Sequence, residues 1–231
     1  MKQNPLQNVA TALARHYGSF AASDSSAGLR PGEWSTLVRI VLEQGKSTKK
    51  NRDWSWITEK SLATAGEAAA ETVSRLADVL ESAGQAGNKA GLLNALAKWW
   101  QRRFPDADAR AVLQGRSLEH WHNELRAMRG VSWDLADRIL LVVGGLPVYP
   151  LDRASMRIAH RHGWMEATAE YDEWQAFFVS STCESEVELE QLWRWNVRVG
   201  RDFCGKNPDC QRCPLKSLLP ASGPVPLDGD E

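Results

Sequence analysis

The 231-residue chain lacks the features of several specialised structural classes. It has no run of about 18 or more apolar residues, so no transmembrane helix is expected. Residues 1–20 lack the uninterrupted apolar stretch of a secretory signal. Hydrophobic residues make up 43% and charged residues 25%, which are average values. The composition therefore excludes a disordered, collagen-like or coiled-coil chain and predicts a globular protein of one large or two small domains.

Cysteine is scarce, and its distribution is uneven. Of the four cysteines, three lie within residues 204–213. A secreted disulfide framework spreads more cysteines over a shorter chain. The pattern predicts a metal site or a reactive loop in a cytoplasmic protein.

An overall excess of one charge is also missing. The net charge is −1 and the sequence pI is about 6.5, so the whole chain gives no electrostatic argument for nucleic acid. Residues 98–163, however, carry 11 Lys and Arg against 7 Asp and Glu, a local charge of +4. Any anionic partner is expected there.

Alternation typical of strands is absent, and no internal repeat is visible. The apolar spacing instead predicts an all-α fold. The eleven tryptophans are interpreted mainly as core residues. Helices are expected over residues 4–17, 34–43, 58–64, 69–82, 90–104, 118–128, 133–143, 152–161, 170–180 and 187–201.

Three segments carry candidate chemistry, and the first is MRGVSWD. It joins two predicted helices by a link so short that it requires Gly130. The free N–H groups at the start of the following helix suit a DNA phosphate, and such a contact positions a duplex without reading its sequence. The alternative is an ordinary helical hairpin.

The second segment is PVYPLDRASMRIA, where Asp152 stands at the expected start of a helix. Taken alone, it is best explained as a helix N-cap. The third is CGKNPDCQRCPL, with Cys204, Cys210 and Cys213. Three cysteines spaced by five and two residues are typical of iron–sulfur or zinc loops, whereas three free thiols are the alternative.

In this order and spacing, the three segments resemble the helix-hairpin-helix DNA glycosylases of the endonuclease III and adenine glycosylase superfamily. The resemblance covers roughly residues 30–216. It implies a six-helix barrel with the hairpin at 31–147 and a second helical domain from 1–30 and 148–218, followed by a disordered tail at 219–231. The active site would lie in the cleft between the domains, with Asp152 as the catalytic residue.

Two upstream segments extend the resemblance. VLEQGKST resembles the family's first DNA-contacting loop, and GQAGNKA resembles the turn before the next barrel helix. Lys46, Lys49, Lys50 and Arg52 are candidates for phosphate contacts, although a charge run is more often a solvated face. The full set of implied DNA-binding residues is Gln44, Lys46, Gln85, Asn88, Lys89, Arg129, Gly130, Val131 and Ser132.

The chain departs from the family pattern at three places. Bifunctional members carry a lysine where this chain has Asp134, and the second hairpin glycine is Ser132. Asp134 is expected to pair with Arg138, four residues along the same helix. The fourth cysteine position falls on Leu219, and Cys183 is rejected as a substitute because a predicted helix of about 25 Å separates it from Cys204. An iron–sulfur cluster with a different fourth ligand and a metal-free loop both stay open.

The resemblance implies a monomeric base excision repair enzyme that acts on double-stranded DNA with a damaged or mismatched base. Without the lysine, it would hydrolyse the N-glycosidic bond and leave an abasic site. Two alternatives are a non-catalytic helix-hairpin-helix DNA-binding protein and a zinc-stapled interaction module. Asp152 in an open pocket would favour the enzyme; Asp152 buried only as an N-cap would favour the binding protein.

Overall fold

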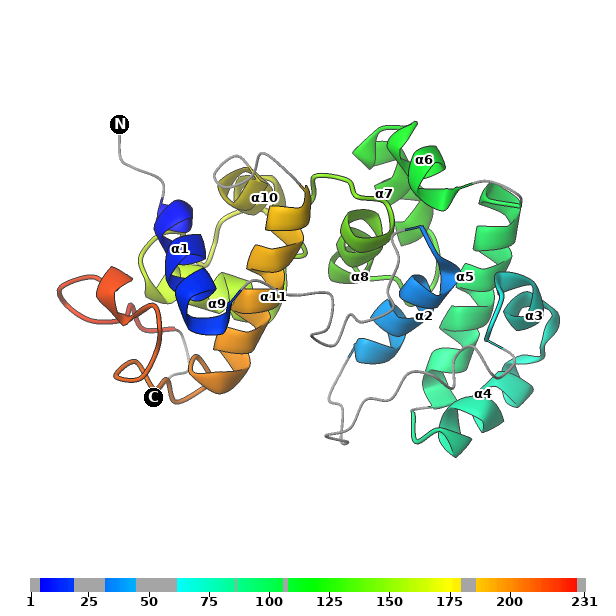
Figure 1. The fold of residues 1–231 in the computed structure, drawn as a ribbon, viewed down its shortest axis with the longest axis horizontal. Helices are drawn as coiled ribbons and strands as arrows, with labels where there is room; N and C mark the ends of the chain where they lie inside the picture. The colour runs from blue at the N-terminus through cyan, green and yellow to red at the C-terminus, as the bar shows by residue number, and fades with distance from the viewer. Residues whose placement is uncertain are drawn as a thin grey trace. The chain divides into compact units, whose positions relative to one another are not determined.

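The computed structural model describes residues 5–18, 32–44, 62–85, 87–105, 108–179 and 186–227. Within these ranges every regular element is a helix and none is a strand, which confirms the all-α prediction (Figure 1). No helix among them is long and apolar enough to cross a membrane. The chain forms two compact units: residues 22–146, called the hairpin unit, and residues 1–21 with 147–231, called the terminal unit.

The hairpin unit is built around its longest helix, α5, which contacts α2, α3 and α4. A short 3-10 turn, Gly87–Lys89, precedes α5, and a π-helical segment, Ile139–Val143, continues α8. All five residues of that π-helical segment are buried. The α-helices of this unit are α2 (Trp34–Glu43), α3 (Ala65–Ala70), α4 (Val73–Ser82), α5 (Ala90–Arg103), α6 (Ala109–Gln114), α7 (Leu118–Arg126) and α8 (Trp133–Arg138).

Aromatic side chains fill the core of the hairpin unit. Trp99 and Trp121 meet edge to face with ring centroids 6.3 Å apart, and Trp34 meets Trp100 at 5.7 Å. All four are buried, as is Phe104 between them. Buried indole N–H groups need acceptors; Trp34 donates to the Leu62 carbonyl and Trp121 to the Leu113 carbonyl. The interpretation of these tryptophans as core residues is confirmed.

The helix boundaries differ from the prediction at two places. The single helix expected over 69–82 is broken, because Glu71 is extended and the Thr72 hydroxyl accepts a hydrogen bond from the Arg75 N–H as the N-cap of α4. Helix α6 was not predicted. It begins at the N-cap Asp108, whose carboxylate accepts from the Arg110 N–H. Most of the helix predicted over 58–64 lies outside the described residues.

The terminal unit is organised around α11 (Glu186–Asp202), which packs against α1 (Pro5–Tyr17) and α9 (Arg153–Arg161). Helix α10 (Tyr171–Val179) and a 3-10 turn, Lys216–Leu218, complete it. Helices α9 and α11 approach so closely that a Cβ added to Gly200 would lie 2.3 Å from the Ala154 Cβ. Glycine is therefore required at this point of α11.

The C-terminal residues differ from the expected disordered tail. Residues 219–227 lie against α9, where the Val225 N–H donates to the Arg161 carbonyl at 2.9 Å. The His160 ring nitrogen Nε2 lies 3.0 Å from the Pro226 carbonyl oxygen. The proline- and glycine-rich composition of this segment predicted disorder. Its backbone contacts with a helix far away in the sequence could not be predicted from local sequence.

Candidate functional site

The hairpin between α7 and α8 is stabilised by its own backbone and by a serine cap. Gly130 has φ of +94°, a conformation that residues with a Cβ adopt only at a cost. The Val131 N–H donates to the Met128 carbonyl, and the Ser132 hydroxyl accepts from the Leu135 N–H at 3.2 Å. Ser132 thus replaces a glycine with a good N-cap. Arg129, Gly130 and Ser132 are exposed, whereas Val131 is buried.

Asp134 forms the expected ion pair with Arg138. Its Oδ1 accepts from Arg138 Nε at 2.9 Å, and its Oδ2 lies 2.8 Å from a terminal guanidinium nitrogen. Both oxygens are therefore occupied by a cation on the next turn of the helix. Asp134, which the motif resemblance aligns with the lysine of bifunctional glycosylases, is thus an ion-paired carboxylate.

An exposed aromatic ring lies beside this hairpin. Trp133 is 42% exposed, and the Arg126 guanidinium lies over its ring at 4.5 Å. The His122 ring meets the indole edge to face at 5.1 Å, and His122 is itself bonded to the buried Asp137 at 2.7 Å. A supported indole beside exposed arginines is a surface that suits nucleic acid. Trp133 is not among the predicted DNA-binding residues, because the sequence favours a core position for most tryptophans.

Lys89 and Gln44 are brought together, though in a way that the sequence did not indicate. The Lys89 ammonium donates to the carbonyls of Leu42 and Gln44, at 2.6 Å each, and so caps the end of α2. Burial lowers the pKa of this lysine, partly offset by Glu43. Lys89 therefore fixes the backbone that carries Gln44, a structural contact beside its proposed role at DNA.

The other candidates of these loops are partly described. Gln85 is half-buried in the turn after α4, where its N–H donates to the Leu80 carbonyl at 2.8 Å, and Asn88 is exposed. Lys46, the neighbouring Lys49, Lys50 and Arg52, and Cys183 lie outside the described residues.

Asp152 is the N-cap of α9, and each of its carboxylate oxygens accepts a hydrogen bond. Oδ1 accepts from the N–H groups of Ala154 at 2.7 Å and Ser155 at 2.9 Å. Oδ2 accepts from the indole N–H of Trp193 at 2.8 Å. The residue is half-buried. Three neutral donors hold the carboxylate in one orientation, and no cation is among these partners.

Trp193 belongs to α11 and is 6% exposed. Three residues along the same helix, Asn196 donates to the Tyr149 hydroxyl at 2.8 Å, which lies 2.9 Å from the Ser155 hydroxyl. Gln175 accepts from the Tyr149 N–H and donates to the Tyr149 carbonyl. These hydrogen bonds could not be predicted from the sequence, because the residues that form them come from four separate segments of the chain.

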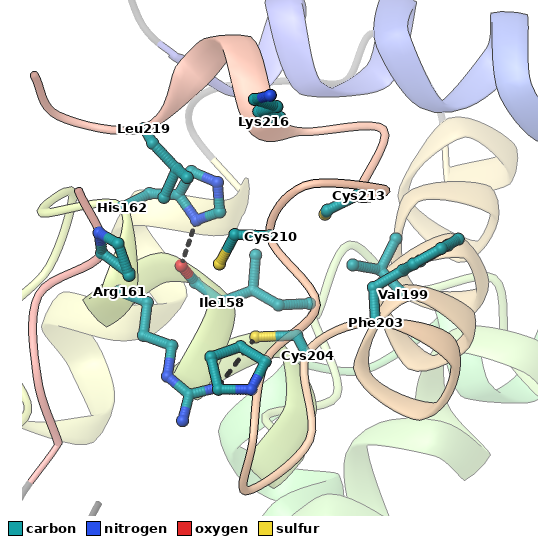
Figure 2. Close-up of a pocket in the computed structure, with 12 residues that line it drawn as sticks. Ile158, Arg161, His162, Val199, Phe203, Cys204, Cys210, Cys213, Lys216 and Leu219 are labelled. Atoms are coloured by element: carbon teal, nitrogen blue, oxygen red, sulfur yellow. Dashed lines mark hydrogen bonds between the residues drawn. The ribbon is translucent and has the colours of Figure 1, made fainter.

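The three loop cysteines line one cavity at the far end of α9 from Asp152 (Figure 2). Cys204 is buried, and its sulfur lies 3.4 Å from a guanidinium nitrogen of Arg161, which also donates to the Gly205 carbonyl at 2.7 Å. Arg161 is 2% exposed. These protein contacts hold the cysteine loop to α9.

Two of the thiols that line this cavity, Cys210 and Cys213, have raised pKa values. Burial raises the pKa of Cys213 to about 11 and also raises the pKa of Cys210. His162 lines the same cavity, and its ring nitrogens lie 2.8 Å from the Ile158 carbonyl and 3.4 Å from the Leu215 carbonyl. Burial lowers the pKa of His162.

The donor set does not fit a cluster held by four cysteines. Leu219, at the place of the fourth cysteine, lines the cavity with an aliphatic side chain that cannot bind a metal. In the described part of the chain, no group of three or more His, Cys, Asp or Glu side chains is arranged to hold a metal ion.

Comparisons with known proteins were made at the level of sequence and of structure. No protein-family model matches the chain, and no curated protein matches it by sequence. Solved structures do match. A non-covalent endonuclease III–DNA complex superposes with a TM-score of 0.67 at 16% identity, covering 95% of each chain.

Two further structures give the same result. A trapped endonuclease III–DNA covalent intermediate has a TM-score of 0.63 at 16% identity, over 94% of this chain and 95% of that one. A thermostable thymine-DNA glycosylase has a TM-score of 0.68 at 12% identity, over 91% and 93%. The chain therefore shares its overall fold with endonuclease III and with this thymine-DNA glycosylase. At these identities the likeness establishes the fold alone.

Proposed function

We propose that this protein is a base excision repair DNA glycosylase that hydrolyses the N-glycosidic bond of a damaged or mismatched base. The observation that carries the proposal is Asp152, a carboxylate held by three neutral N–H donors at the start of α9. It stands where the motif resemblance puts the catalytic residue, in a chain whose fold matches DNA glycosylases along nearly its whole length.

The reaction needs a negative charge that persists beside the sugar. As the bond between the base and C1′ breaks, positive charge develops on the deoxyribose, and a fixed carboxylate stabilises it. Water then adds to C1′ and loses its proton, while the base leaves with its bonding electrons and gains a proton. Asp152 would stabilise the cationic sugar and orient the water. The target nucleotide must leave the base stack to reach it.

Duplex binding is assigned to the hairpin unit. Exposed backbone at Gly130 and Ser132 would contact phosphates, and the exposed Arg126 and Arg129 would add charge. Gln44, Gln85 and Asn88 would fill the space that the displaced nucleotide leaves. These contacts position the DNA, so they should depend strongly on salt and weakly on sequence.

The test is a panel of duplexes, each with one damaged or mismatched base, assayed for base release with and without alkali. One duplex should yield alkali-labile sites with the wild-type protein. Asp152→Asn should reduce release by about 10² to 10³-fold or more while duplex binding stays nearly unchanged. Asp172→Asn, at an exposed carboxylate on α10, is the matched control and should keep full activity. Full activity of Asp152→Asn would refute the assignment.

We also propose that the enzyme leaves the strand intact. Strand opening by β-elimination needs an amine that forms an imine with the sugar, whereas Asp134 is a carboxylate paired with Arg138. Borohydride added during turnover should therefore trap no protein on DNA. A covalent adduct in stoichiometric yield would show that another lysine supplies the amine.

The cysteine loop takes no part in this chemistry. We propose that it is a structural element held to α9 by Arg161 and by Arg157, whose Nε donates to the Cys204 carbonyl at 2.6 Å. An iron–sulfur cluster completed by a ligand from outside the described residues is the alternative for this loop.

A second candidate function is non-catalytic DNA binding. It is favoured by the N-cap geometry of Asp152, because capping alone would account for an aspartate at this position. A protein of this kind would bind all duplexes of the panel, release no base from any, and lose nothing in Asp152→Asn, since asparagine caps helices equally well.

A further inference from the structure

One face of α11 supports the turn that carries Asp152. Trp193, Asn196 and Gly200 are spaced by three and four residues, so they lie on the same side of the helix. Trp193 bonds to Asp152, Asn196 reaches Ser155 through Tyr149, and Gly200 allows the close approach of Ala154. Three independent contacts thus converge on residues 152–155.

The hydrogen bonds distinguish the two oxygens of Asp152. An ionised carboxylate offers about four acceptor sites, two on each oxygen. Oδ1 already accepts two backbone N–H groups, and Oδ2 accepts only the Trp193 indole. Among the described residues, the remaining acceptor site therefore belongs to Oδ2, and the indole fixes the direction in which that site points.

We propose that Trp193 is a positioning residue that aims the Oδ2 atom of Asp152 at the reacting sugar and water. This inference rests on the proposed glycosylase function. The indole N–H donates 2.8 Å from Oδ2 out of a ring that is 6% exposed, so solvent does not readily replace it. An indole carries no charge, so it orients the carboxylate and leaves the negative charge available to the transition state.

The charged groups beside this pair are few. The Arg194 guanidinium lies 5.4 Å from the centre of the Trp193 ring and pairs with Glu190 at 2.7 Å. On α9, the Arg157 side chain donates to the carbonyls of Arg153 and Cys204. None of these side chains is a hydrogen-bond partner of the Asp152 carboxylate among the described contacts, so its immediate partners are the three neutral donors.

The decisive variant is Trp193→Phe, which keeps an aromatic ring and removes the N–H. The matched control is Trp174→Phe, because Trp174 is 1% exposed in the same unit and its indole nitrogen has no hydrogen-bond partner among the described residues. Trp193→His is the rescue variant, since its imidazole Nε2 occupies the ring position of the indole nitrogen.

Trp193→Phe should lower kcat about tenfold with KM nearly unchanged, because the lost bond orients a catalytic group and does not bind DNA. Trp193→His should restore part of kcat. Trp174→Phe should match the wild type in both kcat and KM.

A kcat of Trp193→Phe equal to that of the wild type, or an equal loss of kcat in Trp174→Phe, would overturn the positioning role. The hydrogen bond itself has a readout that needs no activity. The Trp193 indole N–H resonance, assigned by its loss in Trp193→Phe, should exchange slowly with solvent, and faster in Asp152→Ala. Slow exchange in a protein that releases no base would refute the glycosylase function and leave the contact standing.

Discussion

Asp134 and Asp152 show two ways in which this chain holds a carboxylate near the start of a helix. Asp134, in the hairpin unit, has both oxygens on the guanidinium of Arg138. Asp152, in the terminal unit, has its oxygens on two backbone N–H groups and one indole. A guanidinium cancels the charge of its partner, whereas neutral donors orient the carboxylate and leave its charge in place.

The two carboxylates also differ in whether their hydrogen-bond partners depend on tertiary packing. The partner of Asp134 is four residues away on the same helix, so any helix there would supply it. The indole partner of Asp152 is 41 residues away, and it reaches the carboxylate only because α9 and α11 pack closely. Four predictions test these local and tertiary contacts in the two units.

The largest effect is expected where the packing of α9 on α11 is closest. Gly200→Ala would place a Cβ 2.3 Å from that of Ala154, so the helices must separate. Overpacking of this kind costs about 1–3 kcal/mol, and it should also move Trp193 away from Asp152. The variant should have a lower free energy of unfolding, measured in denaturant, and a lower rate of base release.

Gly91→Ala is the matched control in the other unit. Gly91 also lies within a helix, but a Cβ there would meet its nearest neighbour, Val73, only at an ordinary 3.9 Å. This variant should be unchanged or gain up to about 1 kcal/mol from better helix propensity. Equal effects of the two substitutions would show that the approach of α9 to α11 is not tight.

A smaller effect is expected at the hairpin. Gly130→Val forces a β-branched residue to φ of +94°, at a cost of about 1–2 kcal/mol, although the space around Gly130 would admit a Cβ. Binding should weaken for duplexes of every sequence, as measured by fluorescence anisotropy at several salt concentrations. Gly205→Val, where nothing lies within 4 Å, serves as the control. A loss confined to one sequence would contradict backbone recognition.

Metal binding by the cysteine loop should contribute little to the stability of the protein. Chelator treatment should leave Tm unchanged, and the denatured protein should yield four titratable thiols, one for each cysteine of the chain. The physical reason is that Leu219 supplies no ligand and the loop already contacts Arg161. Leu219→Cys provides the comparison for iron uptake. Brown wild-type protein that contains iron and sulfide would instead support the cluster.

The smallest effect concerns Tyr17, whose ring lies 4.3 Å from the Arg198 guanidinium of α11. Burial, aided by Asp202, raises the pKa of Tyr17 from 10.0 to about 12. The fold therefore favours the neutral phenol, so this contribution to stability is complete below pH 10 and disappears as pH rises toward 12. The difference in unfolding free energy between wild type and Tyr17→Phe should shrink over that interval. A constant difference would contradict the raised pKa.

Local features were predictable from the sequence, and tertiary ones were not. The all-α class followed from apolar spacing, and the Asp134–Arg138 pair followed from a separation of four residues. The break at Thr72 could have been found, because threonine before a helix is a common N-cap. The bond from Trp193 to Asp152 could not, since helix spacing reveals that a tryptophan is buried but not which acceptor its N–H reaches.

The residues that follow the 3-10 turn at Lys216–Leu218 cover part of the cavity that the three thiols line. Leu219 and Pro224 line the cavity of the three thiols, and Val225 bonds to the backbone of the same Arg161 that contacts the Cys204 sulfur. A chain shortened after Leu218 would lose these side chains and the backbone bond to Arg161. The buried Cys204 should then react faster with alkylating reagents, although the removed segment contains no cysteine.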